Sequence, residues 1–227
     1  MTLEENVEAL GVLAEPQRRR VFELVQRDGP VTVADLVTGL GIGRTLVAFH
    51  LAKLVDAGFV EAVEPRRATG DKGRPAQRFR TSGREVVASV PDRRYELLAG
   101  ILLDGVAAHR PGESAHDSAL RAARRRGTQL GRSFARGRIA RRAATALARL
   151  EPLLVSVGYA PRREGDEMSV RNCPFDRFRE EHTEQVCSLN LALSDGYLDG
   201  LGVDDVLKTR LRSCPDSCCV VFEPTSG

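Results

Sequence analysis

The segment from residue 44 to residue 64 constrains the fold of this chain more than any other part. Val47, Leu51 and Leu54 are spaced i, i+4 and i+7, so they form the buried stripe of a helix over residues 44–57. Gly58 suits the position that closes such a helix, and residues 59–64 have the pattern of a strand. The segment therefore predicts a helix that buries one side and leads directly into a strand.

The neighbouring segments predict three helices before this one and a second strand after it. The helices are expected at residues 3–13, at 16–28 and at 33–40, and Thr32 caps the third. A turn rich in glycine precedes residue 44, a loop rich in Gly, Pro and Arg covers residues 65–76, and residues 77–80 return as a strand. This order of elements is the winged helix-turn-helix arrangement, with the hairpin as its wing.

The exposed residues of the last helix and of the wing are the ones that this arrangement presents to DNA. An α-helix fits the major groove, where its N-terminal side chains reach the base edges. In this chain the helix offers Arg44, Thr45, Ala48, Phe49, His50 and Lys53. The wing holds six cations against the single acid Asp71, and such a loop suits phosphates or the minor groove: Arg66, Arg67, Lys72, Arg74, Arg78 and Arg80.

Two of these assignments have alternatives. His50 can pack toward the wing or bond a backbone group instead of contacting a phosphate. A winged helix can also bind protein, but the six cations of the wing favour double-stranded DNA as the partner.

Charge and composition support DNA binding by the first part of the chain only. Residues 1–150 carry 26 Lys and Arg against 17 Asp and Glu, whereas residues 151–227 carry 8 against 14. No apolar run approaches the roughly 18 residues of a membrane span, and the acidic N-terminus does not have the pattern of a secretion signal. We therefore expect a cytoplasmic protein with no membrane partner, in a compartment where thiols stay reduced.

The middle of the chain is expected to hold a dimerisation helix. An apolar stripe at helical spacing is formed by Tyr95, Leu98, Ile101, Leu102, Gly105 and Val106. Two DNA half-sites require a two-fold symmetric protein, so this helix predicts a homodimer, although a core helix explains the stripe nearly as well. Ten arginines and no acid follow between Ser118 and Leu150, a pattern typical of a solvated helix face. Contacts with DNA or with the acidic part of a partner chain are the alternatives.

The last third of the chain carries every cysteine: Cys173, Cys187, Cys214, Cys218 and Cys219. Cys173 is expected to begin one helix and Cys187 the next, and helix N-termini favour the metal-binding thiolate. If the segments converge on one edge, three or four thiolates can hold an iron–sulfur cluster or zinc. Cys173, Cys187, Cys214 and Cys218 are the predicted ligands, with His182 and Cys219 as second choices.

The elements around these cysteines predict a small α/β unit. A hairpin is expected around Glu164-Gly165-Asp166, a helix over residues 186–201, and a closing strand over residues 218–223. Between them a short helix would place Phe175, Phe178 and His182 on one face. Two further interpretations stay open, because buried cysteines can be inert and Cys214 with Cys218 could form a reversible disulfide.

Parts of the sequence resemble known bacterial repressors. The run from Val47 to Val60, with His-Leu-x-x-Leu-x-x-x-Gly and a following apolar residue, resembles the recognition-helix signature of the ArsR-like superfamily. Gly73-Arg74-Pro75 with Phe79 resembles the wing of the SufR-like branch, the repressors of iron–sulfur biogenesis. Ala48 departs from many relatives, which carry a polar residue there, and this departure puts base contact at that position in doubt.

The cysteine segments are similar to the C-terminal domain of the same branch. The matching segments are Asn172-Cys173-Pro174-Phe175, Val186-Cys187-x-x-Asn190 and Cys218-Cys219-Val220. In that family three separated cysteines bind an iron–sulfur cluster. The resemblance therefore implies a cluster, expected as 4Fe–4S, on Cys173, Cys187 and either Cys214 or Cys218, with zinc as the alternative.

These observations predict an α+β chain in three parts. They are a winged helix-turn-helix domain over residues 1–82, a dimerisation helix and linker over 83–116, and a cysteine-containing sensor domain over 117–227. The expected function is DNA-binding transcription regulation by a protein that senses cluster, metal or redox status, and the resemblance implies a repressor. The alternatives are a structural zinc with a small organic effector, or a thiol redox switch. An enzyme is not expected, because the sequence has no Ser/His/Asp set, phosphate-binding glycine loop or zinc-hydrolase motif.

Overall fold

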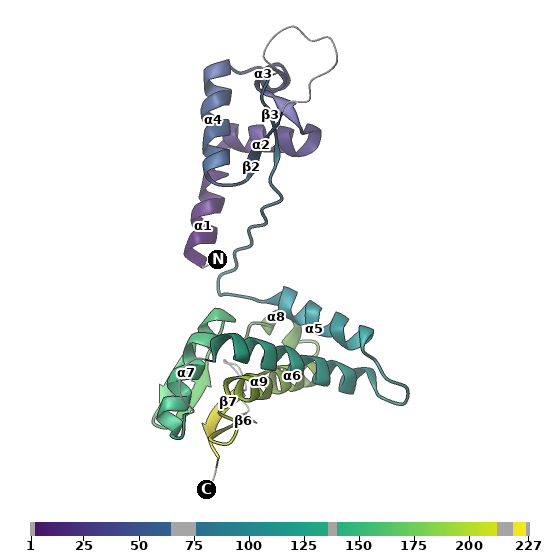
Figure 1. Ribbon diagram of the computed structural model, residues 1–227, viewed down its shortest axis with the longest axis vertical. Helices are drawn as coiled ribbons and strands as arrows, with labels where there is room; N and C mark the ends of the chain where they lie inside the picture. The colour runs from purple at the N-terminus through teal and green to yellow at the C-terminus, as the bar shows by residue number, and fades with distance from the viewer. Residues whose placement is uncertain (1–2, 65–75, 136–139, 213–219, 226–227) are drawn as a thin grey trace. The chain divides into compact units, whose positions relative to one another are not determined.

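The computed structural model describes residues 3–64, 76–135, 140–212 and 220–225. The chain forms two compact units, Met1–Ser89 and Val90–Gly227, each with its own hydrophobic core (Figure 1). Among the described helices, none is both long enough and apolar enough to span a membrane.

The first unit has the predicted order of elements. It consists of α1 (Leu3–Val12), α2 (Pro16–Asp28), β1 (Val31–Thr32), α3 (Val33–Leu40), α4 (Arg44–Asp56), β2 (Val60–Val63) and β3 (Arg78–Thr81). β3 pairs antiparallel with β1 on one side and with β2 on the other. The short strand β1 was not expected, and it joins the start of α3 to the base of the wing.

Local hydrogen bonds explain where the first helices begin. The Glu15 carboxylate accepts the backbone N–H groups of Gln17 and Arg18 at 3.0 and 2.6 Å, and so caps α2. Thr32 and Asp35 form a reciprocal capping box at the start of α3. The amide and hydroxyl of Thr32 both donate to Asp35, and they lower the pKa of its carboxyl below the ordinary value. The predicted Thr32 cap is confirmed.

The predicted stripe of α4 is the centre of the first core. Val47, Leu51 and Leu54 are buried with residues from α2, α3 and the start of β2. Gly58 follows α4 with a φ of +72°, a left-handed conformation that favours glycine. These contacts fix one side of α4 inside the unit and leave the other side at the surface.

The second unit combines helices with a four-stranded antiparallel sheet. Its elements are α5 (Tyr95–Ala107), α6 (Ala115–Phe134), α7 (Ala143–Ser156), β4 (Pro161–Glu164), β5 (Glu167–Val170), α8 (Asp176–Arg179), α9 (Thr183–Leu201), β6 (Leu207–Leu211) and β7 (Val220–Pro224). The strand order is β4-β5-β7-β6. The predicted hairpin is confirmed, since Glu164 pairs with Glu167 across a turn in which Gly165 has a φ of +64°.

Helices α6 and α9 lie against each other backbone to backbone (Figure 1). Gly127 and Gly131 of α6 face Gly196 and Gly200 of α9. A Cβ on Gly127 would lie 2.1 Å from the Leu193 carbonyl oxygen, and one on Gly196 would lie 2.1 Å from that of Arg124. Only glycine allows two helices to approach this closely, so these four positions set the packing of the unit.

Three expectations for this part of the chain require correction. The segment 83–116 is divided, because residues up to Ser89 belong to the first unit while Leu98 and Ile101 of α5 enter the core of the second. The predicted apolar stripe of α5 is also divided: Leu98 and Ile101 are buried in the core, whereas Leu102 and Val106 are exposed at the surface.

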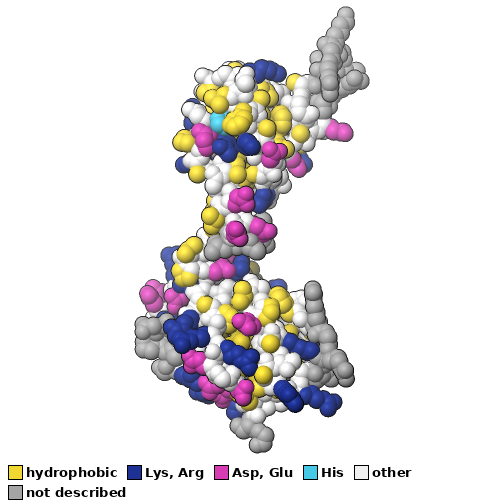
Figure 2. Space-filling view, turned by 90° about the vertical axis from the view of Figure 1, so that its left-hand side faces the viewer, with side chains coloured by type: hydrophobic (Ala, Val, Ile, Leu, Met, Phe, Trp, Pro, Cys, Tyr) yellow, Lys and Arg dark blue, Asp and Glu magenta, His cyan; other side chains and the backbone are white. Residues whose placement is uncertain are grey.

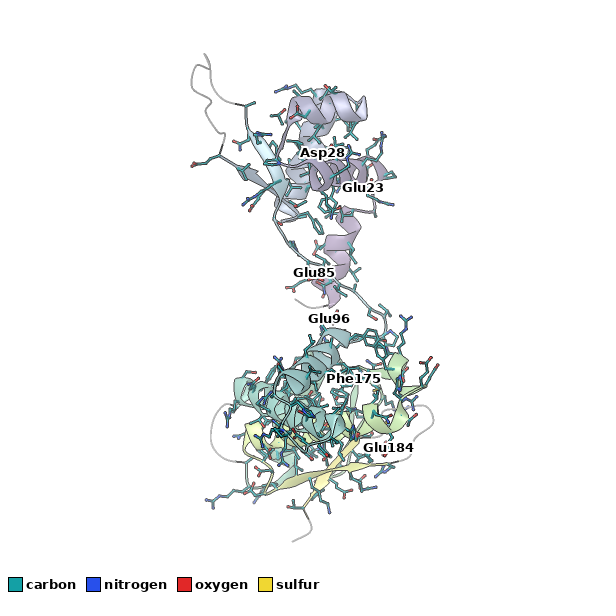
Figure 3. The ribbon with its side chains drawn as sticks, turned by 90° about the vertical axis from the view of Figure 1, so that its right-hand side faces the viewer. Glu23, Asp28, Glu85, Glu96, Phe175 and Glu184 are labelled. Atoms are coloured by element: carbon teal, nitrogen blue, oxygen red, sulfur yellow. The ribbon has the colours of Figure 1, made fainter. Side chains whose placement is uncertain are left out.

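The expected helical face around Phe178 is also wrong. Phe175 is fully buried and Phe178 is exposed, because Phe175 precedes α8 as its N-cap residue, with a non-helical backbone, and so does not share the helix with Phe178 (Figure 3 labels Phe175). His182 lies outside α8 too, as the residue before α9.

Candidate nucleic-acid interface and thiol site

The outer face of α4 carries five of the six residues expected to contact DNA from this helix. Arg44, Thr45, Ala48, Phe49 and Lys53 are exposed, in contrast to the buried stripe on the opposite side. The Phe49 side chain is 53% exposed, which is unusual for a large aromatic ring. Leu46, which the sequence interpretation did not select, is exposed on the same helix.

This face has the chemistry that base recognition uses. An arginine at the start of a groove-binding helix can form paired hydrogen bonds with guanine, and apolar side chains contact the methyl group of thymine. Arg44 supplies the first kind of group, and Ala48 and Phe49 supply the second. Lys53 is exposed in the last turn of α4, where it lines a pocket together with Glu5 and Glu8 of α1.

His50 does not belong to the exposed face. Its side chain lies in the core of the first unit, with the residue only 4% exposed, and its Nδ1 atom is 3.4 Å from Oε2 of Glu15. Its ring also meets the edge of the Phe49 ring, with 5.5 Å between centroids. The buried position favours the packing alternative for His50 over the phosphate contact, with the cap of α2 as its neighbour in place of the wing.

Only the base of the wing is described. Arg66, Arg67, Lys72 and Arg74 lie outside the described residues, in the connection between β2 and β3. Arg78 is exposed on β3, and its Nη2 atom donates to the Pro30 carbonyl at 2.5 Å. Arg80 pairs with Glu61 across the two strands at 2.7 Å, which neutralises one of the six wing cations. Among the described residues of the wing, Arg78 is thus the one that stays a candidate for contact with DNA.

The arginine run of α6 is partly committed to contacts within the chain. Arg121 binds Glu113, Arg124 binds Asp199 and Arg126 binds Asp104, with nitrogen–oxygen distances of 2.7–2.9 Å. On the face drawn in Figure 2, dark blue Lys and Arg side chains of this unit are interspersed with magenta Asp and Glu. Arg136 and Arg138 lie outside the described residues. At least three of the eight described arginines of this run therefore form ion pairs within the unit.

Cys173 lies in a buried turn between β5 and α8. The residue is 6% exposed and belongs to the core cluster of the second unit, next to the fully buried Phe175. Its carbonyl oxygen accepts the Asp176 backbone N–H at 3.2 Å, which closes the turn. The sequence prediction of a strand-to-helix junction at this cysteine is confirmed.

The turn at Cys173 is tied to the chain that enters α5. The Arg93 guanidinium donates to the Cys173 carbonyl at 2.9 Å and also to Oδ1 of Asn172. Nδ2 of Asn172 donates to the Asp92 carbonyl at 2.7 Å, and the Arg94 backbone N–H donates to the Pro174 carbonyl at 3.0 Å. Sequence reasoning missed Arg93, because nothing near it in the chain signals a partner 80 residues away.

Cys187 is the fifth residue of α9, whose first turn carries the Glu184 labelled in Figure 3, and its side chain is half-buried. Both described cysteines carry thiols. Cys214, Cys218 and Cys219 lie outside the described residues, in the connection that enters β7 at Val220. β7 pairs antiparallel with β5, so the start of β7 at Val220 lies beside the end of β5. From that end of β5 the chain continues to Cys173.

These donors fit a soft metal in kind, but the described set is incomplete. Thiolates are the ligands that zinc and iron–sulfur clusters prefer, and such sites use three or four of them. Within the described residues, no group of three or more His, Cys, Asp or Glu side chains could hold a metal ion. Cys173 and Cys187 are thus the part of the predicted site that the structure describes.

His182, the second-choice ligand, lies beside a groove on the same unit. The groove has a volume of about 350 Å³ and runs between α5, α8 and α9. Apolar side chains form most of its walls, and Tyr95 and Phe178 meet edge to face there with 5.3 Å between ring centroids. His182 is the residue directly before α9. It lines this groove and is exposed.

The comparisons with known proteins support the assignment of the first unit. No curated protein matches the chain. A family model described as a helix-turn-helix domain matches residues 13–63, which covers the chain from the end of α1 to the end of β2. Together with the wing strand β3 and the exposed face of α4, this match shows a winged helix-turn-helix domain of the kind that DNA-binding transcription regulators use.

Proposed function

We propose that this chain is a homodimeric transcription regulator of the SufR-like branch that reads DNA with α4 and senses iron–sulfur cluster status through Cys173 and Cys187. The observation that carries the DNA part is the division of α4 into a buried stripe and an exposed face with Arg44, Ala48 and Phe49. The resemblance of the cysteine segments to the SufR-like domain supports the sensing part. Cys214 and Cys218 are proposed as further ligands from the sequence.

The dimer is proposed to form through α5. Leu102, Leu103 and Val106 expose large apolar side chains along this helix. A second copy of the same helix would cover them, and a two-fold dimer would present two α4 helices to two half-sites. An iron–sulfur cluster or zinc bound by the thiolates would supply a signal-dependent ligand that stabilises one arrangement of the second unit over another.

The DNA part is tested by selection from a random-sequence DNA pool with the full-length wild-type protein. We expect an enriched site with two-fold symmetry. Arg44→Ala should change the preferred base at one position in each half-site, whereas Lys53→Ala should weaken binding to all sequences and reduce its salt dependence. Binding without any sequence preference would reject the regulator.

The sensing part is tested by anaerobic purification followed by iron, sulfide and zinc analysis. We expect iron and sulfide in equal amounts and a visible absorption band, both lost in Cys173→Ser and in Cys187→Ser. Cys219→Ser is the comparison variant, because Cys219 is only a second-choice ligand and the proposed set of Cys173, Cys187, Cys214 and Cys218 predicts that this variant keeps its iron and sulfide. DNA affinity should differ at least tenfold, or about 1.4 kcal/mol, between the loaded and the metal-free wild type. Equal affinity in the two states would reject sensing and leave the DNA part intact.

A second function is favoured by the groove between α5, α8 and α9. An apolar groove of about 350 Å³ has the size of a small-molecule site, so an organic effector with a structural zinc is the alternative. In that case the purified protein would hold zinc without iron, and Cys173→Ser would change stability without changing the response of DNA binding to the effector.

A further inference from the structure

The segment that follows the connection between the two units is hydrogen-bonded to the turn that contains Cys173. Residues 92–94 precede α5 directly, and each of them is hydrogen-bonded to the segment 172–174. The bonds run in both directions, since Asp92 accepts from that segment while Arg93 and Arg94 donate to it. This set of bonds, here called the entry joint, therefore fastens the first residues of the second unit to the cysteine.

Arg93 is the central residue of the entry joint. Its side chain is only 16% exposed, and it reaches Asn172, the carbonyl of Cys173 and, at 3.4 Å, the carboxylate of Asp176. Because its guanidinium is planar and always charged, it holds these three acceptors in one fixed arrangement. A shift of the Cys173 backbone would break or re-aim these bonds.

We infer that Arg93 is a positioning residue that couples the ligand state of Cys173 to the segment entering from the DNA-binding unit. This inference rests on the proposed function, because it takes Cys173 as a ligand of the sensed group. A ligand that stabilises one conformation of residues 172–174 also stabilises the matching conformation of residues 92–94, because the two segments are hydrogen-bonded to each other. The proposed route to the first unit is the short connection that joins Ser89 to the entry joint.

The chain offers a matched control for Arg93 at the opposite end of α5. Arg121 has a side chain that is 28% exposed, and it also binds one carboxylate, that of Glu113, and one backbone carbonyl, that of Ala108. It therefore anchors the end of α5 as Arg93 anchors its start. The Arg121 contacts involve no residue of the segment 172–174.

The test compares four full-length proteins, the wild type, Arg93→Gln, Arg93→Lys and Arg121→Gln. Each is studied metal-free and after anaerobic loading with ferrous and ferric iron and sulfide, or with Zn²⁺. Bound metal is measured by absorption and metal analysis, and affinity is measured on the DNA selected by the wild type. We expect all four to load equally. The ratio of affinities between the two states should be at least tenfold in the wild type and in Arg121→Gln. It should fall below about threefold in Arg93→Gln and recover in part in Arg93→Lys, which restores the charge.

Hydrogen exchange at single amides gives a readout that does not involve DNA. Loading should slow exchange of the Arg94 amide at least threefold, because this amide donates to the Pro174 carbonyl, and should leave the Ala108 amide at the other end of α5 unchanged. An Arg94 amide that does not respond to loading contradicts the coupling.

The remaining outcomes separate the inference from the function on which it rests. A wild-type affinity that does not respond to loading, or a wild type that takes up neither metal, rejects the proposed sensing and the coupling with it. An unchanged ratio in Arg93→Gln rejects the coupling alone. Loss of metal from Arg93→Gln also rejects it, because Arg93 would then support the ligands and not transmit their state.

Discussion

In the first unit the residues that stabilise the fold and the candidate functional residues are different residues. In the second unit one residue has both roles. In α4 of the first unit, Val47 and Leu51 hold the helix in the core, while Arg44 and Phe49 lie on the opposite face. In the second unit Cys173 is both a core residue and the first candidate ligand. In α4 the helical period assigns the core residues and the candidate DNA-binding residues to opposite faces, so each set can be substituted alone. A substitution of Cys173 changes the core and the candidate ligand together.

The chain contains a built-in means of following the units separately. It has no tryptophan, and its three tyrosines, Tyr95, Tyr159 and Tyr197, all belong to the second unit. Tyrosine fluorescence during urea unfolding therefore reports on the second unit, while far-ultraviolet circular dichroism reports on both.

The largest effect should come from removing a core side chain of α4. Leu54→Ala is expected to destabilise the first unit by about 2–5 kcal/mol, because the side chain is fully buried. The dichroism transition should acquire an earlier phase while the tyrosine transition keeps its midpoint. Phe49→Ala, on the exposed face, should leave both transitions in place and weaken DNA binding. Loss of stability in Phe49→Ala would show that the two faces are not independent.

A smaller effect, confined to the second unit, is expected from the glycine contact. Gly196→Ala would place a methyl group against the Arg124 carbonyl and should destabilise this unit by about 1–3 kcal/mol, seen as a lower tyrosine midpoint. Gly100→Ala in α5 is the control, since its Cβ would meet only Nη2 of Arg126 at 3.5 Å, and it should stabilise the helix by up to about 1 kcal/mol. Equal responses of the two variants would mean that α6 and α9 can separate without loss.

The smallest effect is a dependence on acid that also belongs to the second unit. Arg121, which donates to both carboxylate oxygens of Glu113, holds the pKa of that carboxyl at about 2, below its ordinary value of 4.5. The folded state therefore favours the ionised form, so its contribution is complete above pH 4.5 and declines as the pH falls toward 2. The tyrosine midpoint of the wild type should decrease over that interval, and that of Glu113→Gln should decrease less.

The sequence predicted those parts whose signals are local. The capping residue Thr32, the stripe of α4 and the turn at Gly165 each depend on neighbours within a few positions, and the structure confirms them. The exposure of Leu102 could not be predicted, because the period of a helix does not tell which side of a wide apolar stripe meets the core. His50 shows the same ambiguity at a single position, since a polar residue next to a recognition face can also be buried.

The parts that were missed depend on contacts between distant segments. The Arg93 contact with Cys173 joins residues 80 positions apart, and the pairing of α6 with α9 is visible in the sequence only as two separate glycine pairs. A late helix start had the same effect on a smaller scale, because α8 begins only at Asp176 and leaves Phe175 outside the helix that contains Phe178.

The contact between α6 and α9 has a consequence for how the second unit can move. The carbonyls of Leu193 and Tyr197 lie over Gly127 and Gly131, while those of Arg124 and Thr128 lie over Gly196 and Gly200. Sliding either helix by one turn along its axis would bring a residue with a side chain into a space that admits only hydrogen. The two helices must therefore translate and rotate as one rigid body, and any rearrangement of this unit has to take place in the elements attached to them.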